Sequence, residues 1–99
     1  MDILIIGRSR NTVDTATAQI RAHGFTAEGV IADQDALAAL DTGEFGTLLI
    51  GGGVERVSRE LLKQRAARNG VAVIEARRHG RDIDTYLQEV VYPALRERP

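Results

Sequence analysis

Four short apolar runs, each followed by a turn and then by apolar residues at helical spacing, constrain this chain more than any other feature. The clearest runs are Ile3-Leu4-Ile5-Ile6 and Leu48-Leu49-Ile50, and the other two are Phe25 to Ala32 and Val71-Ala72-Val73-Ile74. Continuous apolar runs of this kind are typical of parallel strands that are buried on both faces. Strands that alternate with helices predict an α/β domain built on a parallel sheet.

Length and composition narrow the class of protein. We expect one α/β domain over residues 1–99, because this length suits a single core. No apolar run approaches the roughly 20 residues that cross a bilayer, and Met1-Asp2 leads straight into a strand. We therefore expect a cytoplasmic protein with no membrane partner. The absence of cysteine excludes disulfides and thiolate chemistry. A net charge of −1 gives no global attraction for nucleic acid, and Tyr86 and Tyr92 fall in the predicted last helix rather than on an aromatic-basic surface, so we expect no nucleic-acid partner.

The first and third helices have clear starts, ends and buried faces. The side chain of Asn11 is expected to cap the first helix, with Asp14 in its first turn and Gly24 at its end. Asn69-Gly70 is expected to stop the third helix. Helical spacing predicts one face packed on the sheet for the first helix, with Val13, Ala16, Thr17 and Ile20, and the third helix is marked by Val54, Val57, Leu61, Leu62 and Ala66.

The second and last helices carry two further expectations. Asp33 is expected to cap the second helix, and Thr42-Gly43 to close it. The last helix should run from about Asp82 to Arg96, with a kink before Pro93 because proline lacks an amide hydrogen. The apolar stripes are Ala36, Leu37 and Leu40 in the second helix, and Ile83, Tyr86, Leu87, Val90, Val91, Ala94 and Leu95 in the last.

Right-handed crossovers and short connections favour the strand order 2-1-3-4, with helices on both faces of the sheet. Thr26 and Glu28 dilute the apolar character of the second strand, which is expected at an edge. This arrangement is a small three-layer Rossmann-like or flavodoxin-like domain. Its first and third strands are neighbours, so the turns after them, residues 7–11 and 51–53, should face one crevice.

The glycine-bearing turns predict an anion-binding site. Successive amides in such turns, next to the start of a helix, favour negative charge, and Arg77, Arg78 and His79 follow the fourth strand at the same edge. We expect an anionic, phosphate- or nucleotide-like small molecule here. The alternative is that the glycines only permit tight turns and the arginines are solvated. The candidate binding residues are Gly7, Arg8, Ser9, Arg10, Asn11, Gly51, Gly52, Gly53, Arg77 and His79.

Neither a known cofactor nor a catalytic group can be assigned. A dinucleotide-binding fingerprint requires glycine where Ser9 and Thr12 stand, and capping explains Asp33 without a ribose. His79 is the one histidine expected near the crevice, but no base-supported nucleophile or metal-ligand spacing accompanies it. We therefore assign no catalytic or metal-binding residues and expect a binding or regulatory module rather than an enzyme.

The order of elements, and Phe45 to Gly51 in particular, resembles the first part of a response-regulator receiver domain. In that family an acidic pair after the first strand holds magnesium, and an aspartate after the third strand accepts the phosphoryl group. Here Gly7 and Arg8 stand at the pair and Gly51 at the acceptor, while the later lysine and the fifth strand have no clear counterpart. The resemblance implies a degenerate, phosphorylation-independent pseudo-receiver.

Association with a protein partner or with a second copy is the alternative function. The fourth strand forms the second edge of the predicted sheet. This apolar edge, with Val71, Val73 and Ile74, can pair with another chain unless a helix, a loop or another subunit covers it. The apolar stripe of the last helix can either join such an interface or pack inside the monomer. A homodimer therefore remains open beside a monomer.

Overall fold

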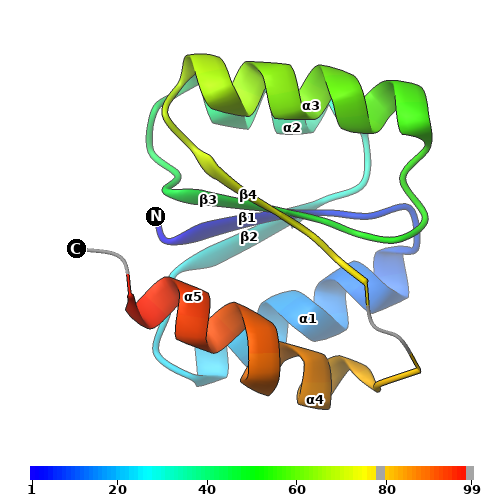
Figure 1. The fold of residues 1–99 in the computed structure, drawn as a ribbon, viewed down its shortest axis with the longest axis vertical. Helices are drawn as coiled ribbons and strands as arrows, with labels where there is room; N and C mark the ends of the chain where they lie inside the picture. The colour runs from blue at the N-terminus through cyan, green and yellow to red at the C-terminus, as the bar shows by residue number, and fades with distance from the viewer. Residues whose placement is uncertain (78–79, 98–99) are drawn as a thin grey trace.

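The computed structural model describes residues 1–77 and 80–97, in which four strands alternate with helices (Figure 1). In chain order the elements are β1 (Ile3–Ile6), α1 (Arg10–Ala22), β2 (Ala27–Val30), α2 (Asp33–Asp41), β3 (Thr47–Ile50), α3 (Arg56–Arg68), β4 (Ala72–Glu75), α4 (Ile83–Tyr86), the π-helical segment η1 (Leu87–Val91) and α5 (Tyr92–Arg96).

The strands form one parallel sheet in the order β2-β1-β3-β4, which confirms the predicted topology. β1 and β3 are the central strands and are buried along their whole length. Their register pairs Ile6 with Ile50 at the carboxyl ends. The two glycine-bearing turns therefore leave the sheet side by side.

The helices lie on both faces of the sheet, as expected for a three-layer α/β domain (Figure 1). α1, α4 and α5 cover one face, where Ile3 and Ile5 of β1 join their core. α2 and α3 cover the other face, where Leu4 and Ile6 point. Successive side chains of a strand point to opposite faces, so the apolar run of β1 supplies both cores.

Two predicted helix caps are wrong. Ser9, not Asn11, caps α1, because its hydroxyl accepts a hydrogen bond from the Thr12 amide at 3.3 Å, and Asp14 lies beyond the first turn. The cap position of α2 is Ala32, while Asp33 is the first helical residue and makes no cap hydrogen bond. The carboxylate of Asp33 instead accepts hydrogen bonds from Arg8, in the loop after β1, and from Ser58 of α3. The predicted buried face of α1 is confirmed.

The apolar residues that mark α3 are not all buried. Leu62 and Ala66 are buried, but Val57 is 82% exposed and Leu61 is 42% exposed. Ser58 takes the inward position one turn before Leu62. The inward face therefore follows the four-residue spacing 58, 62 and 66, and the two apolar residues beside it lie on the solvent side.

The last helix adapts around Pro93 as expected. The amide of Tyr92 donates to the carbonyl of Leu87, five residues earlier, within the π-helical segment η1. Such a segment adds one residue to a turn and shifts the register of the helical residues after it. Tyr92, absent from the predicted stripe, is 1% exposed, and its ring stacks on His23 and Phe25 at centroid distances of 4.0 and 5.9 Å.

Candidate functional site

A pocket of about 330 Å³ opens where β1 and β3 end, between these strands, α1 and α4. Both glycine-bearing turns contribute to its lining. The backbone-rich part of the lining consists of Gly7, Arg8, Ser9, Thr12, Gly51, Gly52 and Gly53. The apolar part consists of Ile5, Ile6, Val13, Ala16, Leu49, Ala76, Ile83, Tyr86 and Leu87.

The pocket brings together six of the ten predicted site residues, namely Gly7, Arg8, Ser9, Gly51, Gly52 and Gly53. Arg10 and Asn11 begin α1 on its exposed side, and Arg77 is exposed after β4, so these three do not line the pocket. His79, together with Arg78, lies outside the described residues.

The glycines of the two turns are there for different reasons. A Cβ on Gly7 would lie 2.9 Å from Val13 Cγ2, and one on Gly51 would lie 3.2 Å from the Ile6 carbonyl oxygen, so both positions are crowded. A Cβ on Gly52 or Gly53 would meet its nearest neighbour at 4.0 or 3.8 Å, which is ordinary contact, and neither residue has a positive φ. A side chain at 7 or 51 would therefore require neighbouring atoms to shift, whereas the described structure has room for one at 52 and 53.

The guanidinium of Arg8 is bound by groups from the loops after β2 and β3. Nη2 donates to Asp33 Oδ1 at 2.7 Å, and Nε and Nη2 donate to the two oxygens of Glu55 at 3.0 Å each. Nη1 donates to the carbonyl of Ile31 at 2.7 Å, and Nη2 also reaches Ser58 Oγ at 3.1 Å. The planar guanidinium of arginine has several donors and suits multidentate pairing of this kind. Arg8 therefore joins three loops at the carboxyl ends of the strands.

Electrostatics keep this cluster ionised. A hydrogen bond from Ser58 Oγ at 2.5 Å, followed by that of Arg8, holds the pKa of Asp33 below its usual range. The hydrogen bond from Arg8 is the main cause that lowers the pKa of Glu55, and the two carboxylates raise the pKa of Arg8. One guanidinium thus faces two carboxylates. The cluster beside the pocket does not offer a spare positive charge.

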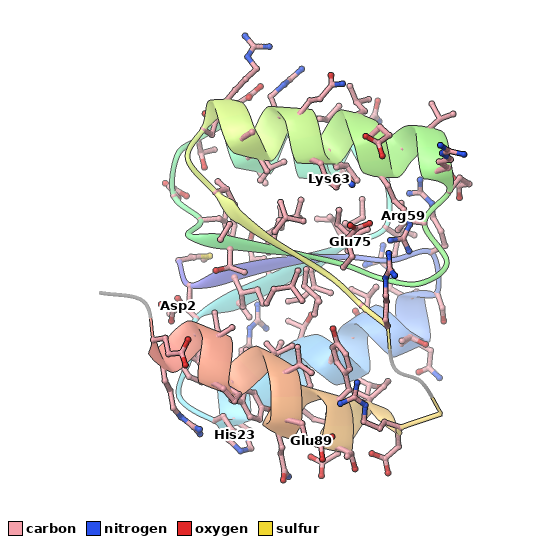
Figure 2. All side chains as sticks on the ribbon, in the orientation of Figure 1. Asp2, His23, Arg59, Lys63, Glu75 and Glu89 are labelled. Carbon is pink, nitrogen blue, oxygen red and sulfur yellow. The ribbon has the colours of Figure 1, made fainter. Side chains whose placement is uncertain are left out.

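A second arginine holds the loop after β3 from the side of α3. Arg59 donates from Nη2 to the Gly51 carbonyl and from Nε to the Val54 carbonyl, both at 2.8 Å, and pairs with Glu75 of β4 at 3.0 Å. Lys63 lies 3.4 Å from the same carboxylate (Figure 2). These charges, Arg59 first, lower the pKa of Glu75. The backbone of the second turn is therefore fixed from outside the pocket.

Sequence reasoning did not identify Ser58, Arg59 or Glu75 as part of this region. Glu75 could have been recognised from the sequence, because it is the charged residue that ends an apolar strand. Arg59 and Lys63 are four residues apart and therefore lie on one side of the helix, where both can pair with a carboxylate. Ser58 had no such signal, because a serine inside a helix is usually a surface residue.

Within residues 1–77 and 80–97, no group of three or more histidine, aspartate or glutamate side chains is placed to hold a metal ion. In the same part of the chain, none of the helices combines the length and the apolar character needed to cross a bilayer.

No protein-family model matches the sequence, and no curated protein matches it either. Among solved structures, the crystal structure of the receiver domain from the hybrid histidine kinase CckA matches with a TM-score of 0.70 and 20% sequence identity. The match covers 96% of this chain and 99% of that chain. This chain has the fold of a receiver domain. The receiver resemblance inferred from the sequence is therefore confirmed for the fold, over nearly the whole chain.

Proposed function

We propose that this receiver-like domain is a non-catalytic binding or regulatory module that holds an anionic small molecule at the turns after β1 and β3. One observation carries the proposal: residues from both turns line the same pocket, beside the N-terminus of the 13-residue helix α1. Backbone amides in such turns and the positive end of a helix dipole favour an anion. The amides of Ser9, Gly52 and Gly53 are the proposed donors.

The arginines have different roles in this proposal. Arg8 shapes the first turn, because its guanidinium is already bound to Asp33 and Glu55. Arg10 and Arg77 are exposed near the same edge, and we propose that they attract the anion electrostatically without gripping it. Asn11 and His79 remain proposed contributors from the same two segments.

A thermal-shift screen with nucleotides, sugar phosphates, carboxylates and simple anions tests the proposal. A ligand that binds only the folded state raises the melting temperature as its concentration rises. We expect at least one class to do so, with a smaller shift in Arg10→Ala and an unchanged shift in Arg68→Ala at the far end of α3. A panel that gives no concentration-dependent shift contradicts the proposal.

A second function, contact with a protein partner without aspartyl phosphorylation, has its own support. Gly7, Arg8 and Gly51 stand where a receiver has its acidic pair and phosphoacceptor, and the Arg8 guanidinium sits between Asp33 and Glu55. The Arg8 guanidinium is thus a fixed cation paired with these two carboxylates. β4 ends the sheet that the structure describes, so its outer edge is open to a partner strand or to a second copy.

Two measurements test this second function. Incubation with acetyl phosphate and Mg²⁺ should add no phosphoryl group detectable by mass spectrometry, and a phosphorylated aspartate would contradict it. Light scattering after size-exclusion chromatography should show a dimer if the partner is a second copy of the chain. A strict monomer at high concentration contradicts self-association, and the partner must then be a different protein.

We propose that the module lies in the cytoplasm, because its cysteine-free sequence suits a reducing compartment.

A further inference from the structure

We infer that the ligand of this pocket is a small amphipathic carboxylate, with its anionic head at the two glycine-bearing turns and an apolar body between α1 and α4. The inference rests on the proposed binding function and specifies its ligand class. Three observations carry it: the apolar walls of the pocket, the engaged state of Arg8, and the room above Gly52 and Gly53.

The walls of the pocket require an apolar ligand body. Val13 and Ala16 of α1, Leu49 of β3, and Ile83 and Tyr86 of α4 all line it. Its volume of about 330 Å³ lies at the lower end of the range in which proteins bind small molecules, which starts at about 300 Å³. A sugar or a bare phosphate would lose its hydration against these walls without gaining partners. A single aromatic ring or a short branched hydrocarbon suits them.

The charge next to the pocket favours a single negative charge on the ligand head. The guanidinium of Arg8 already pairs with Asp33 at 2.7 Å and with Glu55 at 3.0 Å, so it has no uncompensated charge for a ligand. Backbone amides must then hold the head. A phosphate dianion would face the two carboxylates paired with Arg8, whereas a carboxylate brings half that negative charge.

The anionic head of the ligand is proposed to approach the backbone at Gly52 and Gly53. Neither has a positive φ, and a Cβ at either position would make only ordinary contacts inside the protein. Gly52 and Gly53 are exposed and line the pocket without side chains, so a ligand head can approach their backbone. Glycine permits such close approach of a ligand to the backbone.

Isothermal titration calorimetry with matched probes tests the ligand class. Phenylacetate and 4-methylpentanoate carry both parts, phenylacetamide lacks the charge, and acetate and inorganic phosphate lack the body. We expect at least one of the two amphipathic carboxylates to bind at least about tenfold more tightly than each incomplete probe, because both the burial of the body and the charged head contribute.

Two variants locate the binding. Ala76→Leu places bulk in the pocket, and Gly53→Ala adds a methyl group to its lining with only ordinary contacts inside the protein. Both should weaken binding by about tenfold or more. Ala38→Leu on the exposed side of α2 is the matched control and should bind as the unmodified protein does. Should Ala76→Leu fail to fold, Gly53→Ala alone decides the location.

The outcomes separate this inference from the proposed function. If phosphate or a nucleotide binds more tightly than the amphipathic carboxylates, and Gly53→Ala weakens that binding, the ligand class is wrong and the site stands. If phenylacetamide binds as tightly as the carboxylates do, the anionic head is wrong. If neither carboxylate binds, the inference is overturned, and the wider thermal-shift panel then decides the proposed function on its own.

Discussion

Arg8 and Asp33, 25 residues apart in sequence, form an ion pair of 2.7 Å between the loop after β1 and the start of α2. Glu55 and Ser58 extend this pair to the start of α3. The three loops that surround the candidate pocket on this side are therefore connected through one guanidinium. A cation placed there by the chain itself makes the carboxylates structural groups.

Removing that guanidinium should destabilise the fold. Arg8→Ala removes the donor to Asp33 Oδ1 and to the Ile31 carbonyl, and we expect a loss of about 1–3 kcal/mol in the free energy of unfolding. Arg10→Ala, at an exposed position that starts α1, should change it by less than about 0.5 kcal/mol. Urea unfolding of both variants measures the difference. Equal stability of the two would show that the Arg8 cluster is not structural.

The same cluster should make the protein sensitive to acid. Because the pKa of Asp33 is lower in the folded chain than its ordinary value of about 3.9, its contribution to stability is present above that value. That contribution is lost as the pH falls through the lower folded pKa. Asp33→Asn should flatten this part of the curve of unfolding free energy against pH. Parallel acid limbs for the variant and the unmodified protein would contradict the assignment.

Two glycines in the same pocket should respond differently to alanine. Gly7→Ala places a Cβ 2.9 Å from Val13 Cγ2, and relieving that clash should cost about 1–3 kcal/mol. Gly52→Ala meets nothing closer than 4.0 Å and should leave stability unchanged within about 0.5 kcal/mol. Thermal unfolding compares them directly. A destabilised Gly52→Ala would reveal a structural need for that glycine.

Adjacent leucines in α3 make a matched pair. Leu62 is fully buried against the sheet, so Leu62→Ala should destabilise by about 2–5 kcal/mol through lost burial and a cavity. Leu61 is 42% exposed, and Leu61→Ala should cost clearly less, about 1 kcal/mol or below. Denaturant midpoints of the two variants check the orientation of the helix. A larger loss of stability in Leu61→Ala than in Leu62→Ala would mean that α3 presents a different face to the sheet.

The buried hydroxyl of Tyr92 finds no hydrogen-bond partner among the described residues, and burial raises the pKa of this group. Tyr92→Phe removes an unpaired polar atom, so stability should stay the same or rise by about 1 kcal/mol. Because the pKa of Tyr92 is higher in the folded than in the unfolded chain, its contribution to the free energy of unfolding is fully present below about pH 10. That contribution is lost as the pH rises through the folded pKa. The variant should lose less stability in that alkaline range. A destabilised Tyr92→Phe would indicate a partner for the hydroxyl.

Most of the fold was predictable because it depends on local patterns. The apolar runs of β1 and β3 placed both strands at the centre, and crossover handedness gave the order of the sheet. The departure from regular α-helix before Pro93 followed from its missing amide hydrogen. The burial of the Tyr92 side chain could not be predicted, because apolar spacing does not reveal the extra residue of a π-helical turn.

The site was harder to predict than the fold. The meeting of the two turns at one pocket followed from topology alone. The role of Asp33 did not, because a preferred capping residue at a helix start looks the same whether it caps or binds a distant arginine. Ser58 and Leu61 show the same limit in α3, since the inward face depends on how the helix packs and not only on which residues are apolar.

We propose that the two glycine-bearing turns form one binding site. Two-dimensional ¹H-¹⁵N NMR spectra during titration with the strongest ligand test it most directly, because each backbone amide reports separately. We predict that the amide signals of Ser9 and of Gly51 to Gly53 shift together over one concentration range. Shifts confined to one turn, or centred on the β4 edge, would contradict a shared site.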